Sequence, residues 1–154
     1  MTAAFRWRRP DEADHARIAP VLDAWWGGRD MSGMLPRLFF KHFTGTSLVA
    51  ETDDGALAGF VVAFVSQDDP TAGYIHFVGV DPAHRASGLG RDLYERTFAE
   101  LRGRGCTRVR AITSPVNTGS IAFHTRMGFD RVAPPVHVDH DGPGEDRVVF
   151  SRAL

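Results

Sequence analysis

Hydrophobic positions recur along the chain with two different periods, and each period predicts a different kind of element. Apolar residues at every third or fourth position indicate helices, and short runs rich in β-branched and aromatic residues indicate strands. Clusters of Asp, Gly and Pro separate these runs and mark turns. The predicted strands are 5–8, 47–51, 56–65, 74–80 and 107–112, with a final hairpin from 129 to 150, and the predicted helices are 10–26, 35–43, 89–102 and 120–127.

The helix predicted at 89–102 is the most clearly amphipathic segment. Leu93, Thr97 and Leu101 follow Leu89 at intervals of four, which places them on one face. The element order is β-α-α-β-β-β-α-β-α-β-β, and no repeat or linker divides the chain. This order predicts a mixed α/β fold, with helices covering a mostly antiparallel central sheet, in a single domain over 1–154.

Composition narrows the class of protein. The 154 residues are 43% hydrophobic, enough for one core, and 18 basic against 19 acidic residues leave a net charge of −1. No nucleic-acid or membrane partner is expected, because the charge is balanced and no apolar run approaches the roughly 20 residues that span a bilayer. The stretch 1–10 lacks a signal-peptide core, and one cysteine, Cys106, cannot form an internal disulfide. These features predict a soluble, cytoplasmic protein.

The basic residues are almost all arginine, with Lys41 as the exception. A genome rich in G and C favours arginine codons, and we prefer this explanation to a functional arginine surface. The sequence alone does not demand such a surface.

The most informative stretch joins the strand at 74–80 to the helix that follows it. The connecting loop contains Gly88 and Gly90, so a ligand can approach the unpaired N–H groups that open the helix. Together with the helix dipole, such groups form a site for phosphates. The loop lacks the Gly-Lys-Ser/Thr ending of a nucleotide P-loop, and Leu93 stands where a dinucleotide fingerprint has its third glycine.

The pattern Arg85-x-x-Gly88-x-Gly90 resembles the coenzyme A pyrophosphate loop of the GNAT superfamily of N-acetyltransferases. A second motif of that superfamily has its counterpart downstream, where Asn117 precedes a helix with an aromatic residue and Gly128-Phe129 opens the next strand. The resemblance is strongest over 74–129. It implies a GNAT-like fold with two strands splayed apart at the cofactor, and an N-acetyltransferase that uses acetyl-CoA.

The resemblance also assigns the cofactor contacts by their motif positions. The loop amides are expected to wrap the pyrophosphate, the preceding strand to pair with the pantetheine arm, and Asn117 to hydrogen-bond that arm. A backbone N–H near Val78 would polarise the thioester carbonyl as an oxyanion hole. The expected contacts are Val78, Val80, Arg85, Ala86, Ser87, Gly88, Leu89, Gly90, Arg91, Asn117, Ser120 and Phe123.

Two histidines stand where the family usually has other catalytic residues. His124 replaces a tyrosine that often protonates the departing thiolate, and an imidazole with its usual pKa of about 6.5 exchanges protons near neutrality. His76 replaces a glutamate that faces the acceptor amine, and a neutral imidazole can take the amine's proton. A purely structural role is the alternative for each, and the sequence leaves both open.

The acceptor side is less well marked. In the superfamily the first helices and the final hairpin border the acceptor, which makes Trp25, Trp26 and His137 candidate substrate contacts. Aromatic residues at helical spacing are also typical of a core. His137 and His140 superficially resemble metal ligands, but on a strand they would point to opposite faces, so no metal is expected.

The resulting hypothesis is acetyl transfer from acetyl-CoA to a primary amine, with a small molecule as the expected acceptor. Acetylation of protein N-termini or lysines is one alternative. A non-catalytic acyl-CoA-binding module with a closed acceptor side is the other. The resemblance leaves a homodimer open.

Overall fold

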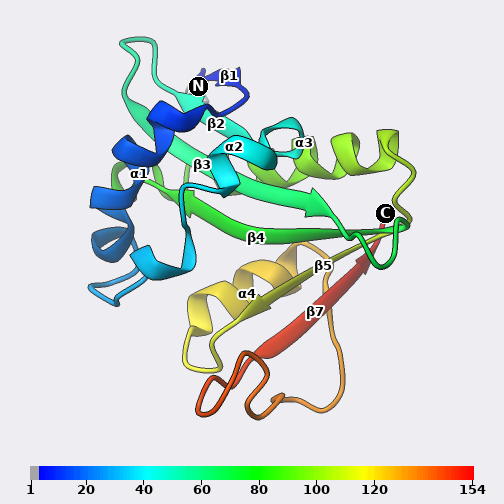
Figure 1. Ribbon diagram of the computed structural model, residues 1–154. Coiled ribbons are helices and arrows are strands. Elements are labelled where there is room, and N and C mark those ends of the chain that lie inside the picture. Colours follow the sequence, from blue (N-terminus) through cyan, green and yellow to red (C-terminus); the bar gives the residue numbers. More distant parts are fainter. Residues whose placement is uncertain (1–3) are drawn as a thin grey trace.

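A computed structural model describes residues 4–154; residues 1–3, part of the N-terminal stretch assessed above, lie outside it. The elements alternate as the sequence predicts (Figure 1). In chain order they are β1 (Arg6–Arg8), α1 (Glu12–Trp25), the 3₁₀ turn η1 (Ser32–Met34), α2 (Phe39–His42), η2 (Thr44–Thr46), β2 (Leu48–Glu51), β3 (Leu57–Val65), β4 (Ala72–Val80), η3 (Pro82–His84), α3 (Leu89–Gly103), β5 (Arg108–Thr113), α4 (Thr118–Arg126), β6 (Asp130–Arg131) and β7 (Val148–Ala153). Of the described helices, none is long and apolar enough to cross a membrane.

Seven strands form one sheet in the order β1-β2-β3-β4-β5-β7-β6. Neighbours pair antiparallel except β4 and β5, which run parallel. The parallel pair follows from α3, because a helical crossover returns the chain to the same end of the sheet. The predicted mixed fold with a mostly antiparallel sheet is confirmed.

Apolar side chains cover both faces of the sheet. On one face, α3 buries the row that begins at Leu89 against β3, β4 and β5. On the other, α1 contributes Ile18 and Leu22, which pack with Phe60 of β3 and Phe77 of β4. The amphipathic helix predicted at 89–102 is confirmed as α3, and its apolar face packs on the sheet.

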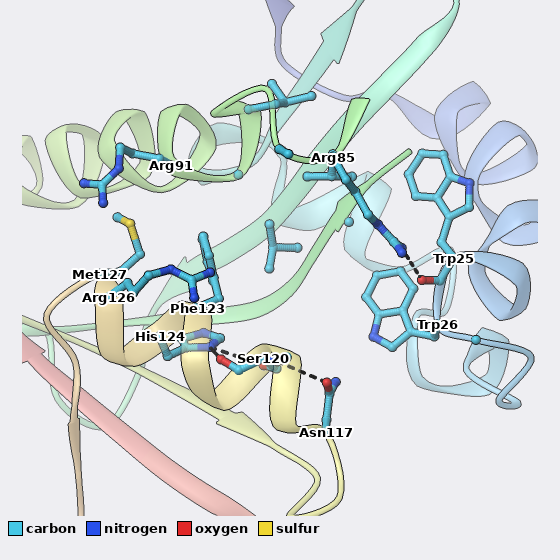
Figure 2. Close-up of a pocket in the computed structure, with 18 of the residues that line it drawn as sticks. Trp25, Trp26, Arg85, Arg91, Asn117, Ser120, Phe123, His124, Arg126 and Met127 are labelled. Atoms are coloured by element: carbon cyan, nitrogen blue, oxygen red, sulfur yellow. Dashed lines mark hydrogen bonds between the residues drawn. The ribbon is translucent and has the colours of Figure 1, made fainter. Parts of the chain in front are cut away.

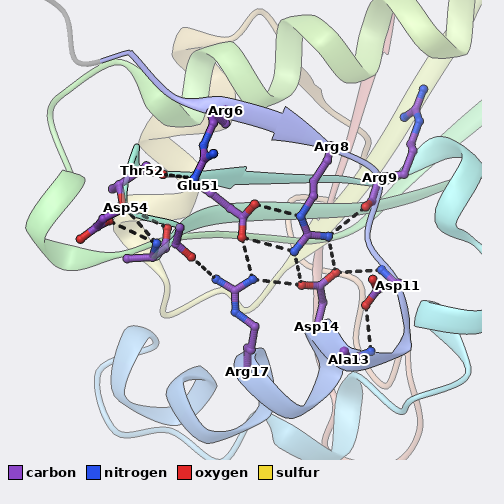
Figure 3. Close-up of polar contacts among 12 residues, drawn as sticks. Arg6, Arg8, Arg9, Asp11, Ala13, Asp14, Arg17, Glu51, Thr52 and Asp54 are labelled. Carbon is purple, nitrogen blue, oxygen red and sulfur yellow. Dashed lines mark hydrogen bonds and ion pairs between the residues drawn. The ribbon is translucent and has the colours of Figure 1, made fainter.

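The start of α1 is attached to the sheet by an ion-pair network (Figure 3). Asp11 caps the helix and forms a reciprocal capping box with Asp14. The Asp14 side chain is only 1% exposed and receives two hydrogen bonds from Arg8 of β1, at 2.6 and 2.8 Å. Glu51 at the end of β2 binds both Arg8, at 2.9 Å, and Arg17 of α1, at 2.8 Å. The network fixes the start of α1 against β1 and β2.

The parallel strands separate halfway along their length. Pairing between β4 and β5 runs from Ala72 to Ile75 on β4 and ends at Ala111 of β5, while β4 continues to Val80. His76 is the first residue beyond the pairing, and it is also the extra residue of a bulge against β3, where Val62 and Ala63 pair with its two neighbours. Figure 1 shows the two strands side by side at one end and separating toward the other. The splayed pair of strands implied by the resemblance is present.

Two predicted elements are shorter than expected. The helix predicted at 35–43 is α-helical only over Phe39–His42, because Pro36 disfavours helical backbone at Leu35. The first strand of the final hairpin is reduced to Asp130–Arg131. Most of the chain from 132 to 147 forms a loop, since its prolines and glycines cannot sustain a ladder.

Candidate functional site

The loop between β4 and α3 has the backbone of an anion site. Ala86 and Gly88 both adopt left-handed conformations, at φ +64° and +86°, which turn the chain sharply before the helix. Gly88 is the N-cap of α3 and supplies no side-chain cap. The Leu89 N–H donates to Ser87 Oγ at 3.4 Å, and the N–H groups that follow it in the first turn are left for a ligand. At Gly90 a Cβ would meet the Phe123 ring at 3.4 Å, so the side-chain-free backbone lies directly against α4.

A first cavity, of about 910 Å³, opens between this loop, the end of β4, α4 and the turn after α1 (Figure 2). Nearly all the predicted cofactor contacts line it: Val78, Val80, Arg85, Ala86, Gly88, Leu89, Gly90, Arg91, Asn117, Ser120 and Phe123. Ser87 is the exception, because its hydroxyl hydrogen-bonds to the carbonyl of His84 within the loop. The sequence motifs therefore converge on one cavity.

Arginine supplies the charge of this cavity, which we call the cofactor cavity. Arg29, Arg85, Arg91 and Arg126 line it, and no Asp or Glu from the described part of the chain does. Such a lining favours a multiply negative ligand. The sequence analysis missed Arg29 and Arg126, because arginine is abundant everywhere in the chain and neither residue belongs to a loop motif.

A second cavity, of about 800 Å³, lies where β4 and β5 diverge and is lined by residues of both strands and of α4. Trp26, Met31, Met34 and Phe77 give it an apolar side. Its polar side carries charges of both signs, from Asp30, Asp141, Glu145, Arg29 and Arg147. Arg147 is ion-paired to Asp141 and Glu145, both at 2.9 Å. Burial, together with nearby Asp141, raises the pKa of Tyr74 in this cavity to about 12. We call this the acceptor cavity.

The two cavities meet, and the residues common to both define the meeting point. They are Trp26, Arg29, Val78, Asn117, Ser120 and His124. A ligand extending along β4 in the cofactor cavity and a second molecule in the acceptor cavity would touch at this junction. Transfer of a group between them would take place there.

His124 lies at the junction, but both of its ring nitrogens are occupied. Nδ1 is 2.8 Å from the Ser120 carbonyl oxygen, which can only accept, so Nδ1 carries the proton of the neutral ring. Nε2 therefore accepts from the Tyr94 hydroxyl at 2.7 Å. The ring is 4% exposed and stacks on Phe150, and burial lowers the pKa of His124 below its usual value. Its one N–H thus points at a carbonyl and not into the cavity, a geometry unlike that expected of a direct proton donor.

His76 lines the acceptor cavity from the bulge of β4. Its Nε2 donates to the Met34 carbonyl at 2.7 Å, which leaves Nδ1 with the lone pair. The ring stacks on Phe39 at 4.4 Å. Burial lowers the pKa of His76, so the ring is neutral at pH 7 and able to accept a proton.

Of the three predicted acceptor contacts, the two tryptophans line a cavity and His137 does not. Trp25 and Trp26 form a wall of the cofactor cavity facing α4 (Figure 2), and Trp26 also reaches the acceptor cavity. Both tryptophans also pack against Phe60, so each belongs to the core and lines the cavity at the same time. Arg85 donates to the Trp25 carbonyl at 2.6 Å and links this wall to the loop.

His137 lines neither cavity, and its Nε2 is bonded to the Val132 carbonyl at 2.9 Å. The expectation that His137 and His140 point apart is wrong, because the segment is a loop and the two rings are in edge contact at 5.8 Å. Within residues 4–154 no cluster of three or more His, Cys, Asp or Glu could hold a metal ion.

Comparison with known proteins agrees with this geometry. Residues 3–129 match the Acetyltransferase (GNAT) family. The chain is 39% identical to the mycothiol acetyltransferase of Rhodococcus erythropolis over 108 residues, which is 68% of this chain and 32% of that protein. It is 30% identical to the L-2,4-diaminobutyric acid acetyltransferase of Streptomyces avermitilis over 132 residues, 81% of this chain and 70% of that protein. The chain thus spans less than half the length of the mycothiol acetyltransferases it matches.

A solved structure gives the same result for the fold. The diaminobutyrate acetyltransferase of Paenibacillus lautus, determined with L-2,4-diaminobutyric acid and coenzyme A, superposes with a TM-score of 0.72 at 22% identity. The match covers 97% of this chain and 94% of that one. The likeness therefore extends over the whole described sheet and its helices.

Proposed function

The chain belongs to the acetyltransferase (GNAT) family, and on that premise we propose that it transfers the acetyl group of acetyl-CoA to a primary amine by direct attack. The observation that carries the proposal is the junction of two cavities at the point where β4 leaves β5. The cofactor cavity suits polyanionic acetyl-CoA, and the acceptor cavity suits the amine that receives the acetyl group.

The cofactor side of the proposal is supported by charge and by backbone. Four arginines and the uncapped first turn of α3 favour the phosphates of coenzyme A. The edge of β4 beyond Ile75 is open toward β5, so the pantetheine arm can pair with Val78 and Val80 as a strand would. A backbone N–H at this edge would then lie beside the thioester carbonyl.

We propose a small molecule as the acceptor. The acceptor cavity has an apolar side and a polar side with charges of both signs, which suits a compact polar amine. Two relatives carry names that refer to small molecules, mycothiol and L-2,4-diaminobutyric acid. Location in the cytoplasm and the absence of a nucleic-acid partner rest on composition alone, and a homodimer stays a prediction.

Acid–base chemistry at the junction begins with the amine. It arrives as an ammonium ion and must lose a proton before it can attack. We assign this step to His76, whose Nδ1 lone pair is available because Nε2 is fixed on Met34. The attacking nitrogen forms a bond to the acetyl carbon, the C–S bond breaks, and the sulfur leaves with the electron pair.

The test is release of free thiol from acetyl-CoA across a panel of small amines and amino-terminal peptides. Wild type is compared with His76→Gln and with His42→Gln, which changes an exposed histidine outside both cavities. We expect amine-dependent release that His76→Gln reduces about 100-fold and His42→Gln leaves intact. Release with peptides alone would favour a protein acceptor, and coenzyme A binding without release for any amine would favour the binding module.

A further inference from the structure

Ser120 is one of the expected cofactor contacts, but the motif assigns no specific role to its side chain. It lies in the first turns of α4, is half-buried, and lines both cavities. Its backbone N–H is used by the helix cap, as the donor to Asn117 Oδ1 at 3.1 Å (Figure 2). Its side chain is therefore the part of the residue that remains for a ligand.

The hydroxyl of Ser120 has one hydrogen-bond partner among the described residues, and that partner is a donor. His124 Nδ1 lies 3.2 Å from Ser120 Oγ and carries a proton, as its shorter contact with the Ser120 carbonyl requires. Ser120 Oγ can therefore only accept in this contact. Among residues 4–154 no acceptor is within reach of its own hydrogen, which is free to point into the junction.

Tyr94 stabilises the tautomer of His124 that carries its proton on Nδ1. Its side chain is fully buried beneath α4, and its hydroxyl occupies Nε2 of His124 at 2.7 Å. A ring whose Nε2 accepts must keep its proton on Nδ1, the side that faces Ser120. Tyr94, His124 and Ser120 thus form a hydrogen-bond chain from the core to the junction, and each bond in such a chain polarises the next.

We propose that the Ser120 hydroxyl is the hydrogen-bond donor to the departing sulfur of the cofactor, and that His124 and Tyr94 are positioning residues that aim it. The assignment rests on the proposed function. As the C–S bond breaks, the electron pair stays on sulfur, and the hydroxyl stabilises the thiolate without giving up its own proton. The nitrogen loses its second proton as the amide forms, and this proton completes the free thiol, while the first proton, taken up by His76 before the attack, passes to solvent.

The test measures the thiolate itself and needs no acceptor. The pKa of the coenzyme A thiol bound to the protein is read from the ultraviolet absorbance of the thiolate as pH rises. Ser120→Ala is expected to raise this pKa by about one unit, a tenfold change in ionisation, because a hydrogen bond to a charged group is lost. Thr125→Ala is the matched control, since it removes an exposed hydroxyl from the same helix that bonds only to the Ile121 carbonyl.

Kinetic variants complete the test. Ser120→Ala is expected to lower kcat by about 10- to 100-fold with little change in KM for acetyl-CoA. Ser120→Thr restores a hydroxyl and should recover most of the loss. Tyr94→Phe should raise the bound thiol pKa by part of the Ser120→Ala change, because His124 can then move its proton to Nε2.

Each result has a definite meaning. An unchanged thiol pKa in Ser120→Ala overturns the assignment while leaving the proposed function intact. An unchanged thiol pKa in Tyr94→Phe, with a shift in Ser120→Ala, overturns the positioning role of Tyr94. A wild-type protein that does not bind coenzyme A refutes the proposed function itself.

Discussion

Replacing Glu51 by Gln tests the ion-pair network that joins α1 to the sheet. The substitution keeps the shape of the side chain and removes its charge. Both carboxylate oxygens are used, one by Arg8 at 2.9 Å and one by Arg17 at 2.8 Å, and the Glu51 side chain is 14% exposed. The arginines keep their contacts with Asp14, so the change isolates one carboxylate.

The magnitude follows from the pKa of Glu51. Hydrogen bonds from Arg8 and then Arg17 lower this pKa from 4.5 to about 2. At about 1.36 kcal/mol per pKa unit, this sets an upper limit of roughly 3 kcal/mol on the pH-dependent stabilisation. Arg8 and Arg17 are each about one-third exposed, so solvent screening reduces the expected contribution to about 1–2 kcal/mol.

The sign is that of a carboxylate whose pKa is lower in the folded state. Glu51 stabilises the fold fully above the pKa of the unfolded chain, and the contribution disappears as pH falls from about 4.5 toward 2. Glu51→Gln should therefore lower the free energy of unfolding by about 1–2 kcal/mol at pH 7, and the difference from wild type should shrink as the pH is lowered through this range.

Urea unfolding at several pH values measures this difference. Glu95→Gln is the control, because Glu95 is exposed on α3 and forms no ion pair with any described residue. That variant should match wild type within about 0.5 kcal/mol. A Glu51→Gln deficit that stays the same between about pH 7 and pH 3 would refute the electrostatic account, since it would then arise from packing.

Two substitutions and one wild-type pH profile separate cofactor binding, packing and proton transfer. Arg126→Ala should weaken coenzyme A binding about tenfold and reduce its dependence on salt, measured by calorimetry at two ionic strengths. In wild type, the acidic limb of the rate–pH profile should lie below pH 6.5, because burial lowers the pKa of His76 and the ring stays neutral as pH falls; a limb above 6.5 would contradict this. Gly79→Ala should cost about 1–3 kcal/mol, because its Cβ would lie 2.5 Å from Phe60 and 3.0 Å from Trp26, whereas Gly103→Ala, with open space, should not destabilise; thermal melts compare them.

Local pattern was sufficient to predict most of the fold. The four-residue spacing from Leu89 to Leu101 specified both the helix and the face that α3 buries, because periodicity and packing depend on the same side chains. The turn at 53–55 between β2 and β3, marked by Asp and Gly, was equally local. Where the prediction failed, over 35–38 and 132–147, the apolar and polar spacing was present but proline restricted the backbone.

The site was predictable where its residues belong to sequence motifs. The loop at 85–91 could be identified because its glycines, placed before a helix, resemble the coenzyme A loop of the GNAT superfamily, and the structure places it on the cofactor cavity. The acceptor cavity gave no such signal, since Asp141 and Arg147 reach it from a loop without regular structure. Tyr94 lies within the helix predicted at 89–102, but nothing local indicates that its hydroxyl meets His124, which lies 30 residues away.

His76 and His124 have the same fixed tautomer and the same direction of pKa shift, and both features bear on the proposed reaction. Each ring fixes its N–H on a carbonyl oxygen, of Met34 for His76 and of Ser120 for His124, and burial lowers the pKa of each. Both are therefore neutral at pH 7 and add no positive charge to the region that an ammonium ion must enter. A protonated imidazole at either position would repel that ion and would hold the proton that the amine has to lose. In the proposed mechanism, burial with a fixed tautomer gives His76 a lone pair for the amine and lets His124 orient the Ser120 hydroxyl. The positive charge of the arginines lies on the lining of the cofactor cavity, where the phosphates would bind.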